Sequence, residues 1–200
     1  VTWTGNGQTR NVPHNLKVTP ELMLVKRRSS NDAWAVYHSG SGAANSTYLN
    51  SDGAFSSSSL WNSTTPTDTT FRVINDGQVN QNGQFYIGYL FATFPGISKV
   101  GRYIGNGSNQ TIDCGFSTPA RFLLIKKASG SGNWYLWDSV RGLTTNPDPH
   151  VSLNINTTQL TGNQNYAYPD NTGFGVQKVS GTNNPEINDN GAIYNFLAIA

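Results

Sequence analysis

The chain repeats itself, and this repeat limits what it can fold into. Gly5-Asn6-Gly7 recurs as Gly105-Asn106-Gly107. Further matches follow in the same order: 22–26 with 122–126, Trp34 with Trp134, Leu49-Asn50 with Leu153-Asn154, 71–73 with 174–176, 79–83 with 187–191, and Tyr86 with Tyr194. The offset grows from 100 to 108 residues, as expected when loops take up insertions and strands do not. We therefore predict two similar domains, residues 1–96 and 97–200, divided near Phe94-Pro95-Gly96-Ile97.

The composition favours strands over helices. The 200 residues include only two Glu, but 21 Gly, five Trp, nine Tyr and nine Phe. Glu is a helix former, whereas aromatic residues favour strands and glycine favours turns. That many aromatic side chains can also bury enough surface to offset the loss of chain entropy on folding. We expect an all-β globular protein.

Segments of strand length occupy matching places in the two copies. Residues 22–26 and 122–126 are apolar runs bounded by proline and polar loops. Residues 33–38 and 133–138 follow turns rich in Ser, Asn and Gly, which predicts a hairpin in each copy. Residues 85–92 and 193–200 follow an Asn-Gly turn and are the expected closing strands. Frequent turns without helical periodicity predict two tandem antiparallel β-sandwich domains. The alternative is one jelly roll to which each copy supplies a sheet.

The charge is nearly balanced. The net charge is +2, with six Lys/Arg and five Asp/Glu in residues 1–97 and seven and six in residues 98–200. Neither half has the basic excess of a protein that binds nucleic acid. The basic runs Lys26-Arg27-Arg28 and Lys126-Lys127 each close an apolar stretch and are interpreted as solvated strand ends. No apolar run approaches the about 20 residues that span a bilayer, so we expect no membrane insertion.

Candidate catalytic patterns are weak. Glu21 and Glu186 lie at different points of their repeats, so they are interpreted as surface residues rather than an acid–base pair. Asp138 and His150 are a candidate dyad, but no serine lies in a Gly-x-Ser-x-Gly elbow. We therefore expect no enzymatic activity. The alternative is a glycan depolymerase.

Candidate sites for metals and cofactors are also weak. His14, His38 and His150 lack the spacing of metal ligands, and the single Cys114 excludes an internal disulfide and a cysteine-based metal site. The Gly-x-Gly pairs lack the third glycine and the helix of a nucleotide loop. The aspartates that might bind calcium are scattered, namely Asp148, Asp170 and Asp189. We expect no metal ion and no cofactor.

Residues 134–142 hold one cluster that could recognise a ligand. In a strand, Trp134 and Asp138 would face one side, and Tyr135 and Trp137 the other. One set is expected to line the core, and if the other were exposed an aromatic ring could stack on a sugar. The alternative is that both sets pack, one on the core and one on a neighbouring subunit or domain. Of the two arrangements, packing of both sets is favoured. The candidate glycan or partner contacts are Trp134, Tyr135, Trp137, Asp138 and Arg141; we expect Asp138 and Arg141 to pair and hold the loop.

Several motifs of the second copy resemble a known family. They are Lys99-Val100-Gly101-Arg102-Tyr103-Ile104-Gly105-Asn106-Gly107, Cys114-Gly115-Phe116, residues 120–127, Asn133-Trp134-Tyr135 and Asp138-Ser139-Val140-Arg141-Gly142. The first copy has matching pieces, among them Tyr48-Leu49-Asn50 and Tyr89-Leu90-Phe91-Ala92, but has His38 where copy two has Asp138. The chain resembles a tandem β-domain of unknown function found in structural and tail-fibre-like proteins of tailed phages, often marine ones.

The resemblance implies a place on the exterior surface of a virion, on the tail or the capsid, and it transfers no catalytic residue. The implied partners are other virion proteins, further copies of the chain (a trimer is favoured, as in fibres) and a host surface glycan. We favour a receptor-binding protein at the tail, because loops such as 45–59 and 143–150 offer neutral hydrogen-bonding groups to sugars. The alternatives are a capsid decoration or head-fibre protein and a lectin-like carbohydrate-binding module.

Overall fold

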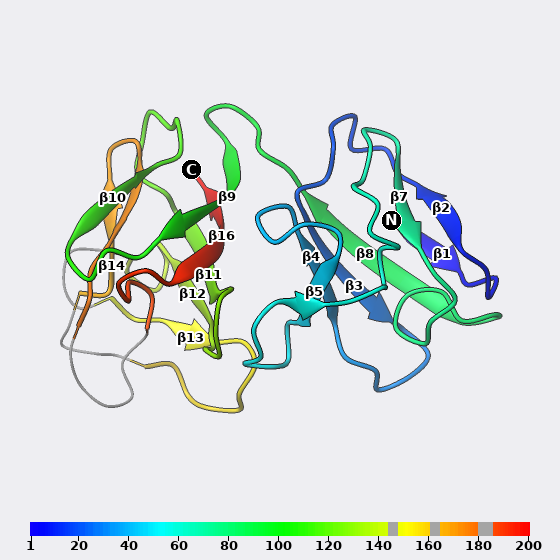
Figure 1. Cartoon of the computed structure of the whole chain (residues 1–200). Helices are drawn as coiled ribbons and strands as arrows, with labels where there is room; N and C mark the ends of the chain where they lie inside the picture. Colours follow the sequence, from blue (N-terminus) through cyan, green and yellow to red (C-terminus); the bar gives the residue numbers. More distant parts are fainter. Residues whose placement is uncertain (144–147, 161–164, 180–185) are drawn as a thin grey trace. The chain divides into compact units, whose positions relative to one another are not determined.

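The computed structural model describes residues 1–143, 148–160, 165–179 and 186–200. These residues form sixteen strands in four antiparallel sheets and contain no helix. They divide into two compact units, which we call unit 1 (Val1–Ala92) and unit 2 (Thr93–Ala200) (Figure 1). The expected all-β class is confirmed.

Unit 1 consists of two sheets with a core between them. The order of its six-stranded sheet is β1 (Thr2–Thr4), β8 (Phe85–Phe91), β3 (Leu22–Arg27), β4 (Ala35–His38), β5 (Asn45–Tyr48) and β6 (Ser56–Ser57). The second sheet pairs β2 (Arg10–Pro13) with β7 (Thr70–Val73). Side chains from both sheets make one buried cluster, including Met23, Tyr37, Trp61, Phe71 and Tyr86.

Unit 2 has the same plan. The order of its five-stranded sheet is β13 (Val151–Ser152), β12 (Trp134–Asp138), β11 (Phe122–Lys127), β16 (Ile193–Ile199) and β9 (Ser98–Ile104). The order of its three-stranded sheet is β10 (Gln110–Asp113), β15 (Gly173–Val176) and β14 (Ala167–Asp170). Its core includes Tyr103, Trp137, Phe174, Tyr194 and Phe196.

The strand orders show that the two units are copies. Strands β1, β8, β3, β4 and β5 correspond to β9, β16, β11, β12 and β13, and β2 and β7 correspond to β10 and β15. Every described strand pairs within its own unit, and each unit has its own buried cluster. The fold is therefore two tandem antiparallel β-sandwiches related by an internal repeat, and the single jelly roll is wrong.

The boundary lies four residues before the expected one. The Thr93 hydroxyl hydrogen-bonds with the N–H and C=O of Val100, at 3.2 and 3.3 Å. The Phe94 N–H donates to the Ser98 carbonyl at 2.9 Å. The turn that looked like a linker is therefore the first hairpin of unit 2, because these hydrogen bonds join it to β9.

The predicted strands are largely confirmed. The apolar runs are β3 and β11, each one residue longer than expected, and the predicted hairpins are the antiparallel pairs β3–β4 and β11–β12. Segment 45–59 is not simply a loop, because β5 and β6 pair within it. Of segment 143–150, residues 144–147 lie outside the described residues.

Candidate functional site

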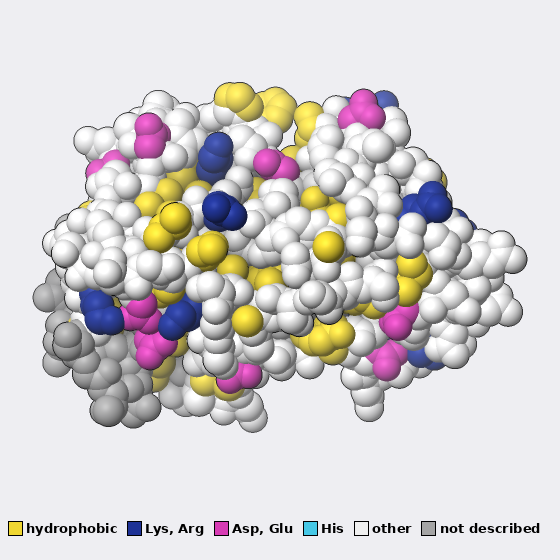
Figure 2. Space-filling view, viewed as in Figure 1, with side chains coloured by type: hydrophobic (Ala, Val, Ile, Leu, Met, Phe, Trp, Pro, Cys, Tyr) yellow, Lys and Arg dark blue, Asp and Glu magenta, His cyan; other side chains and the backbone are white. Residues whose placement is uncertain are grey.

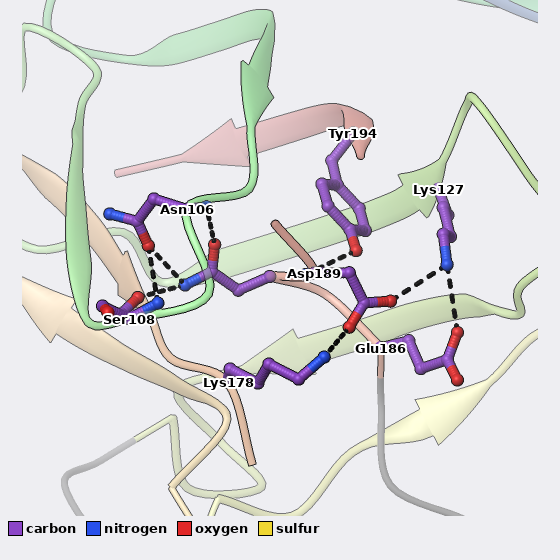
Figure 3. A network of polar contacts seen from close by, with 8 residues as sticks. Asn106, Ser108, Lys127, Lys178, Glu186, Asp189 and Tyr194 are labelled. Atoms are coloured by element: carbon purple, nitrogen blue, oxygen red, sulfur yellow. Dashed lines mark hydrogen bonds and ion pairs between the residues drawn. The ribbon is translucent and has the colours of Figure 1, made fainter. Parts of the chain in front are cut away.

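A buried asparagine joins two distant loops in unit 2 (Figure 3). The backbone N–H of Asn106 donates to the side-chain oxygen of Asn188 at 3.0 Å, and Asn188 donates back to the Asn106 oxygen at 3.2 Å. Asn188 also donates to the Ser108 carbonyl and accepts from Gln110 at 2.8 Å. Asn188 is only 1% exposed, so these contacts satisfy a side chain that would be costly to bury unpaired. We call this arrangement the asparagine lock.

The backbone around the lock is packed tightly. The Gly191 N–H donates to the Gly105 carbonyl, and the Gly105 N–H donates to the Ala192 carbonyl, both at 2.8 Å. The Tyr194 hydroxyl accepts the Asp189 N–H at 2.9 Å (Figure 3). The sequence suggested that the Asn-Gly turn at 190–191 is the tip of a simple hairpin, but the structure shows otherwise. The turn docks on the Gly-Asn-Gly loop 85 residues away.

Unit 1 contains the same lock. Asn80 is fully buried, donates to the Asn6 oxygen at 2.9 Å and accepts the Asn6 N–H at 3.3 Å. The Tyr86 hydroxyl accepts the Gln81 N–H at 2.9 Å, as Tyr194 accepts that of Asp189 in unit 2. Because every partner in the lock belongs to the same unit, the lock stabilises the fold of each copy.

Charged side chains surround the lock of unit 2. Lys127 contacts Asp189 at 3.0 Å and Glu186 at 3.1 Å, and Lys178 also pairs with Asp189 (Figure 3). Partial burial alone would raise the pKa of Asp189, but the hydrogen bonds from Lys178 and Lys127 lower it. Charges of both signs are scattered over the face in Figure 2. Lys126 is fully buried, so its interpretation as a solvated strand end is wrong.

The predicted contact cluster is mostly interior. Tyr135 and Trp137 belong to the buried core of unit 2, and Trp134 on the other face of β12 is buried too. The Tyr135 and Trp137 rings lie 5.9 Å apart, and the Trp137 ring lies 5.2 Å from that of His150. Both faces of this strand are therefore packed, which agrees with the favoured arrangement and leaves no exposed aromatic set on β12.

Asp138 and Arg141 hold the loop, as predicted. One Asp138 oxygen accepts the N–H groups of Val140 and Arg141 at 3.1 and 2.8 Å, and the other pairs with the Arg141 guanidinium. Asp138 is therefore occupied by its own turn rather than by a dyad with His150. In unit 1, His38 has a related role, because its Nδ1 accepts the Gly40 N–H at 3.0 Å.

Sequence reasoning missed a buried polar cluster at Asp148. One Asp148 oxygen accepts the N–H groups of Tyr166 and Ala167 at 2.7 and 2.8 Å, which fixes the start of β14. His150 donates from Nδ1 to the Asp148 carbonyl at 3.3 Å, and its ring lies between those of Trp137 and Tyr166. Both Asp148 and His150 are buried. His150 Nε2 has no hydrogen-bond partner among the described residues.

Burial shifts both titratable groups of this cluster. It raises the pKa of Asp148 to about 6, although the two N–H donors act in the opposite direction, and it lowers the pKa of His150. A carboxyl group with a raised pKa binds more protons in the folded state than in the unfolded state. The contribution of Asp148 to the free energy of unfolding therefore falls as pH rises from about 4 to about 6. His150 acts in the opposite direction, since its contribution falls as pH drops below about 6.5.

Asp148→Asn should remove the Asp148 part of this pH dependence. Between about pH 3.5 and about pH 7, the wild type should lose about 3 kcal/mol of unfolding free energy relative to the variant, at about 1.4 kcal/mol per pKa unit. Urea unfolding at several pH values measures this difference, and the His150 contribution cancels in the comparison. Identical pH profiles of the two proteins would contradict the prediction.

The comparisons with known proteins identify the family. Over residues 1–200, and thus across both units, the chain matches the family described as "Domain of unknown function (DUF7483)". The chain belongs to the DUF7483 family. No curated protein and no solved structure matches it. In this member of DUF7483, the family domain comprises two β-sandwich copies.

The described residues form neither a metal-binding cluster nor a membrane-spanning helix. In the described part of this DUF7483 chain, no three His, Cys, Asp or Glu side chains come together in a way that could hold a metal ion. The same residues include no helix with the length and apolar character needed to cross a membrane.

Proposed function

We propose that the protein is a non-enzymatic structural protein of a tailed-phage virion, and that it acts at the tail as a receptor-binding, host-adsorption protein. The virion context is supported by the resemblance of the 99–107 and 138–142 motifs to phage structural domains. The structural role is supported chiefly by the duplicated asparagine lock. In both units, the side chain of a buried asparagine holds two loops of the sandwich together.

Exposed aromatic residues of unit 1 support the adsorption role. Phe85 and Tyr89 are 53% and 47% exposed and lie on the same face of β8, since they are separated by an even number of residues. The Tyr89 ring stacks on that of Trp34, with centroids 6.1 Å apart and planes at 29°. Exposed, supported rings of this kind offer flat apolar surfaces on which sugars can stack. They replace the buried residues of β12 as candidate glycan contacts.

Competition with phage adsorption tests this function. Purified protein added to host cells should slow adsorption of the phage that encodes it, because both compete for one receptor. Phe85→Ala should weaken the competition about fivefold, corresponding to about 1 kcal/mol. Val140→Ala removes an even more exposed apolar side chain from unit 2 and should have no effect.

Location on the particle separates this proposal from its alternatives. Electron cryo-microscopy of the phage should place the chain at the tail. Density on the capsid shell alone would contradict adsorption and favour a decoration or head-fibre protein, whereas absence from particles would favour a lectin-like module. Shortening of host polysaccharide by the purified protein would contradict the non-enzymatic part.

A further inference from the structure

Every Asn-Gly pair of the sequence lies in a loop that an asparagine lock joins. The pairs are Asn6-Gly7 and Asn82-Gly83 in unit 1, and Asn106-Gly107 and Asn190-Gly191 in unit 2. The four glycines have φ values of 65, 71, 69 and 76°, a left-handed conformation that favours glycine. The fold of the lock therefore requires a glycine directly after each of these asparagines.

An Asn-Gly pair carries the groups for its own deamidation. The glycine nitrogen forms a bond to Cγ of the asparagine, and the side-chain nitrogen leaves as ammonia with the proton of the glycine N–H. Water then opens the cyclic imide at one of its two carbonyl groups, which leaves aspartate or isoaspartate. Glycine favours the first step because it has no Cβ atom to hinder the approach. The step requires a glycine N–H that is free to lose its proton and a backbone that is free to rotate.

The lock of unit 2 engages both of its glycine N–H groups. The Gly107 N–H donates to the Asn188 carbonyl at 3.1 Å, and the Gly191 N–H donates to the Gly105 carbonyl at 2.8 Å. Each acceptor lies on the opposite loop of the lock. The side chain of Asn106 is held as well, because its oxygen accepts a hydrogen bond from Asn188 at 3.2 Å (Figure 3). The attacking nitrogen of each pair is therefore engaged by the contacts that close the lock.

The lock of unit 1 engages its glycines in the same way. The Gly7 N–H donates to the Asn80 carbonyl at 3.0 Å, and the Gly83 N–H donates to the Gly5 carbonyl at 2.9 Å. The Asn6 oxygen accepts a hydrogen bond from the Asn80 side chain at 2.9 Å. Both units therefore place two Asn-Gly pairs where a closed lock keeps them from reacting and an open lock releases them.

We propose that the four Asn-Gly pairs are sites of spontaneous deamidation, and that each pair reacts only while its lock is open. The locks thus protect the chain chemically as well as holding each sandwich together. Isoaspartate runs the main chain through the former side chain, which lengthens the main chain by one carbon atom. Because the loops at Gly105 already lack room for a Cβ atom, a lock with this longer loop cannot close as before. Water is the only other reactant, so this chemistry does not depend on the proposed virion role.

A comparison of the folded and unfolded chain tests the protection. The 200-residue protein is incubated in mildly alkaline buffer with and without unfolding urea, and isoaspartate at each pair is measured by peptide mapping and mass spectrometry. Each pair should react at least about tenfold more slowly in the folded protein, because the lock must open first. A capped peptide of residues 187–193 has no lock and should react equally fast in both media, which controls for urea. Equal rates in the folded and unfolded protein would overturn the proposal.

One substitution should release the pairs of one unit only. Gly105→Ala forces the two loops of the unit 2 lock apart, so deamidation at Asn106 and Asn190 should rise at least about tenfold in native buffer. The pairs of unit 1 should keep their wild-type rates and so provide a control within the same molecule. Gly130→Ala, whose Cβ meets only the Lys127 side chain, should change neither unit. Unchanged rates at Asn106 and Asn190 in Gly105→Ala would overturn the proposal, and the comparison in urea needs no variant to fold.

Discussion

Gly105→Ala should destabilise unit 2 by about 3 kcal/mol or more. A Cβ atom at Gly105 would meet the backbone carbonyl oxygen of Asp189 and the backbone carbon of Asn188, at 3.0 Å from the latter. Neither neighbour is a flexible side chain, so the two loops of the asparagine lock would have to separate. Denaturant unfolding followed by tryptophan fluorescence measures the loss.

Gly130→Ala is the matched control in the same unit. Its Cβ would contact only the side chain of Lys127, at 3.4 Å, so the expected change is within about 0.5 kcal/mol. Gly5→Ala and Gly53→Ala form the equivalent pair in unit 1, because Gly5 faces the Gln81 carbonyl and Gly53 only the Ser51 hydroxyl. If Gly105→Ala changed stability no more than Gly130→Ala, the tight approach of the two loops would be wrong.

Trp137→Ala should cost about 4 kcal/mol of folding free energy. The side chain is completely buried and packs against Tyr135 and His150, so its removal leaves a large cavity in the core of unit 2. Thermal and denaturant unfolding both measure this loss. Val140→Ala, three residues along and 92% exposed, should change stability by less than about 0.5 kcal/mol.

This variant also decides between two views of the β12 aromatic residues. If Trp137 contacted a glycan, Trp137→Ala would remain as stable as the wild type and lose only binding. If Trp137 is a core residue, the protein loses stability whether or not a glycan is present. A stable variant would therefore contradict the packing described for unit 2.

The repeat was the most predictive feature of the sequence. Gly105 and Asn188 recur as Gly5 and Asn80. The lock has no room for a Cβ atom at the glycines, and an apolar side chain at the buried asparagines would leave its hydrogen bonds unmade. The strands β3 and β11 were predictable as well, because their apolar runs are long enough to be recognised locally. The pairing of Asp138 with Arg141 was predictable for the same reason, since three residues separate them in one turn.

Features that depend on distant segments were not predictable from one sequence. Strands β6 and β13 have two residues each, too few for an alternating pattern. The period of a strand separates the two faces of β12 but does not say what covers either face, so the surroundings of Trp134 were not predictable. Asp148 bonds to residues 18 and 19 positions further along the chain, and no local motif marks that contact. Its only local signal is His150 two residues later.

The chemistry of the asparagine lock determines how each copy responds to its medium. The lock is built from neutral amides, which neither titrate nor attract counterions, so acid and salt leave its hydrogen bonds alone. Around it, unit 2 places the ionised Asp189 between Lys127 and Lys178, where unit 1 has the uncharged Gln81 bound to Arg27 at 2.8 Å. Strong salt shortens the range of charge interactions to about 3 Å at 1 M. Strong salt should therefore weaken both ion pairs of Asp189 in unit 2, whereas in unit 1 Arg27 keeps the neutral Gln81 acceptor beside its single ion pair with Asp32 at 3.0 Å.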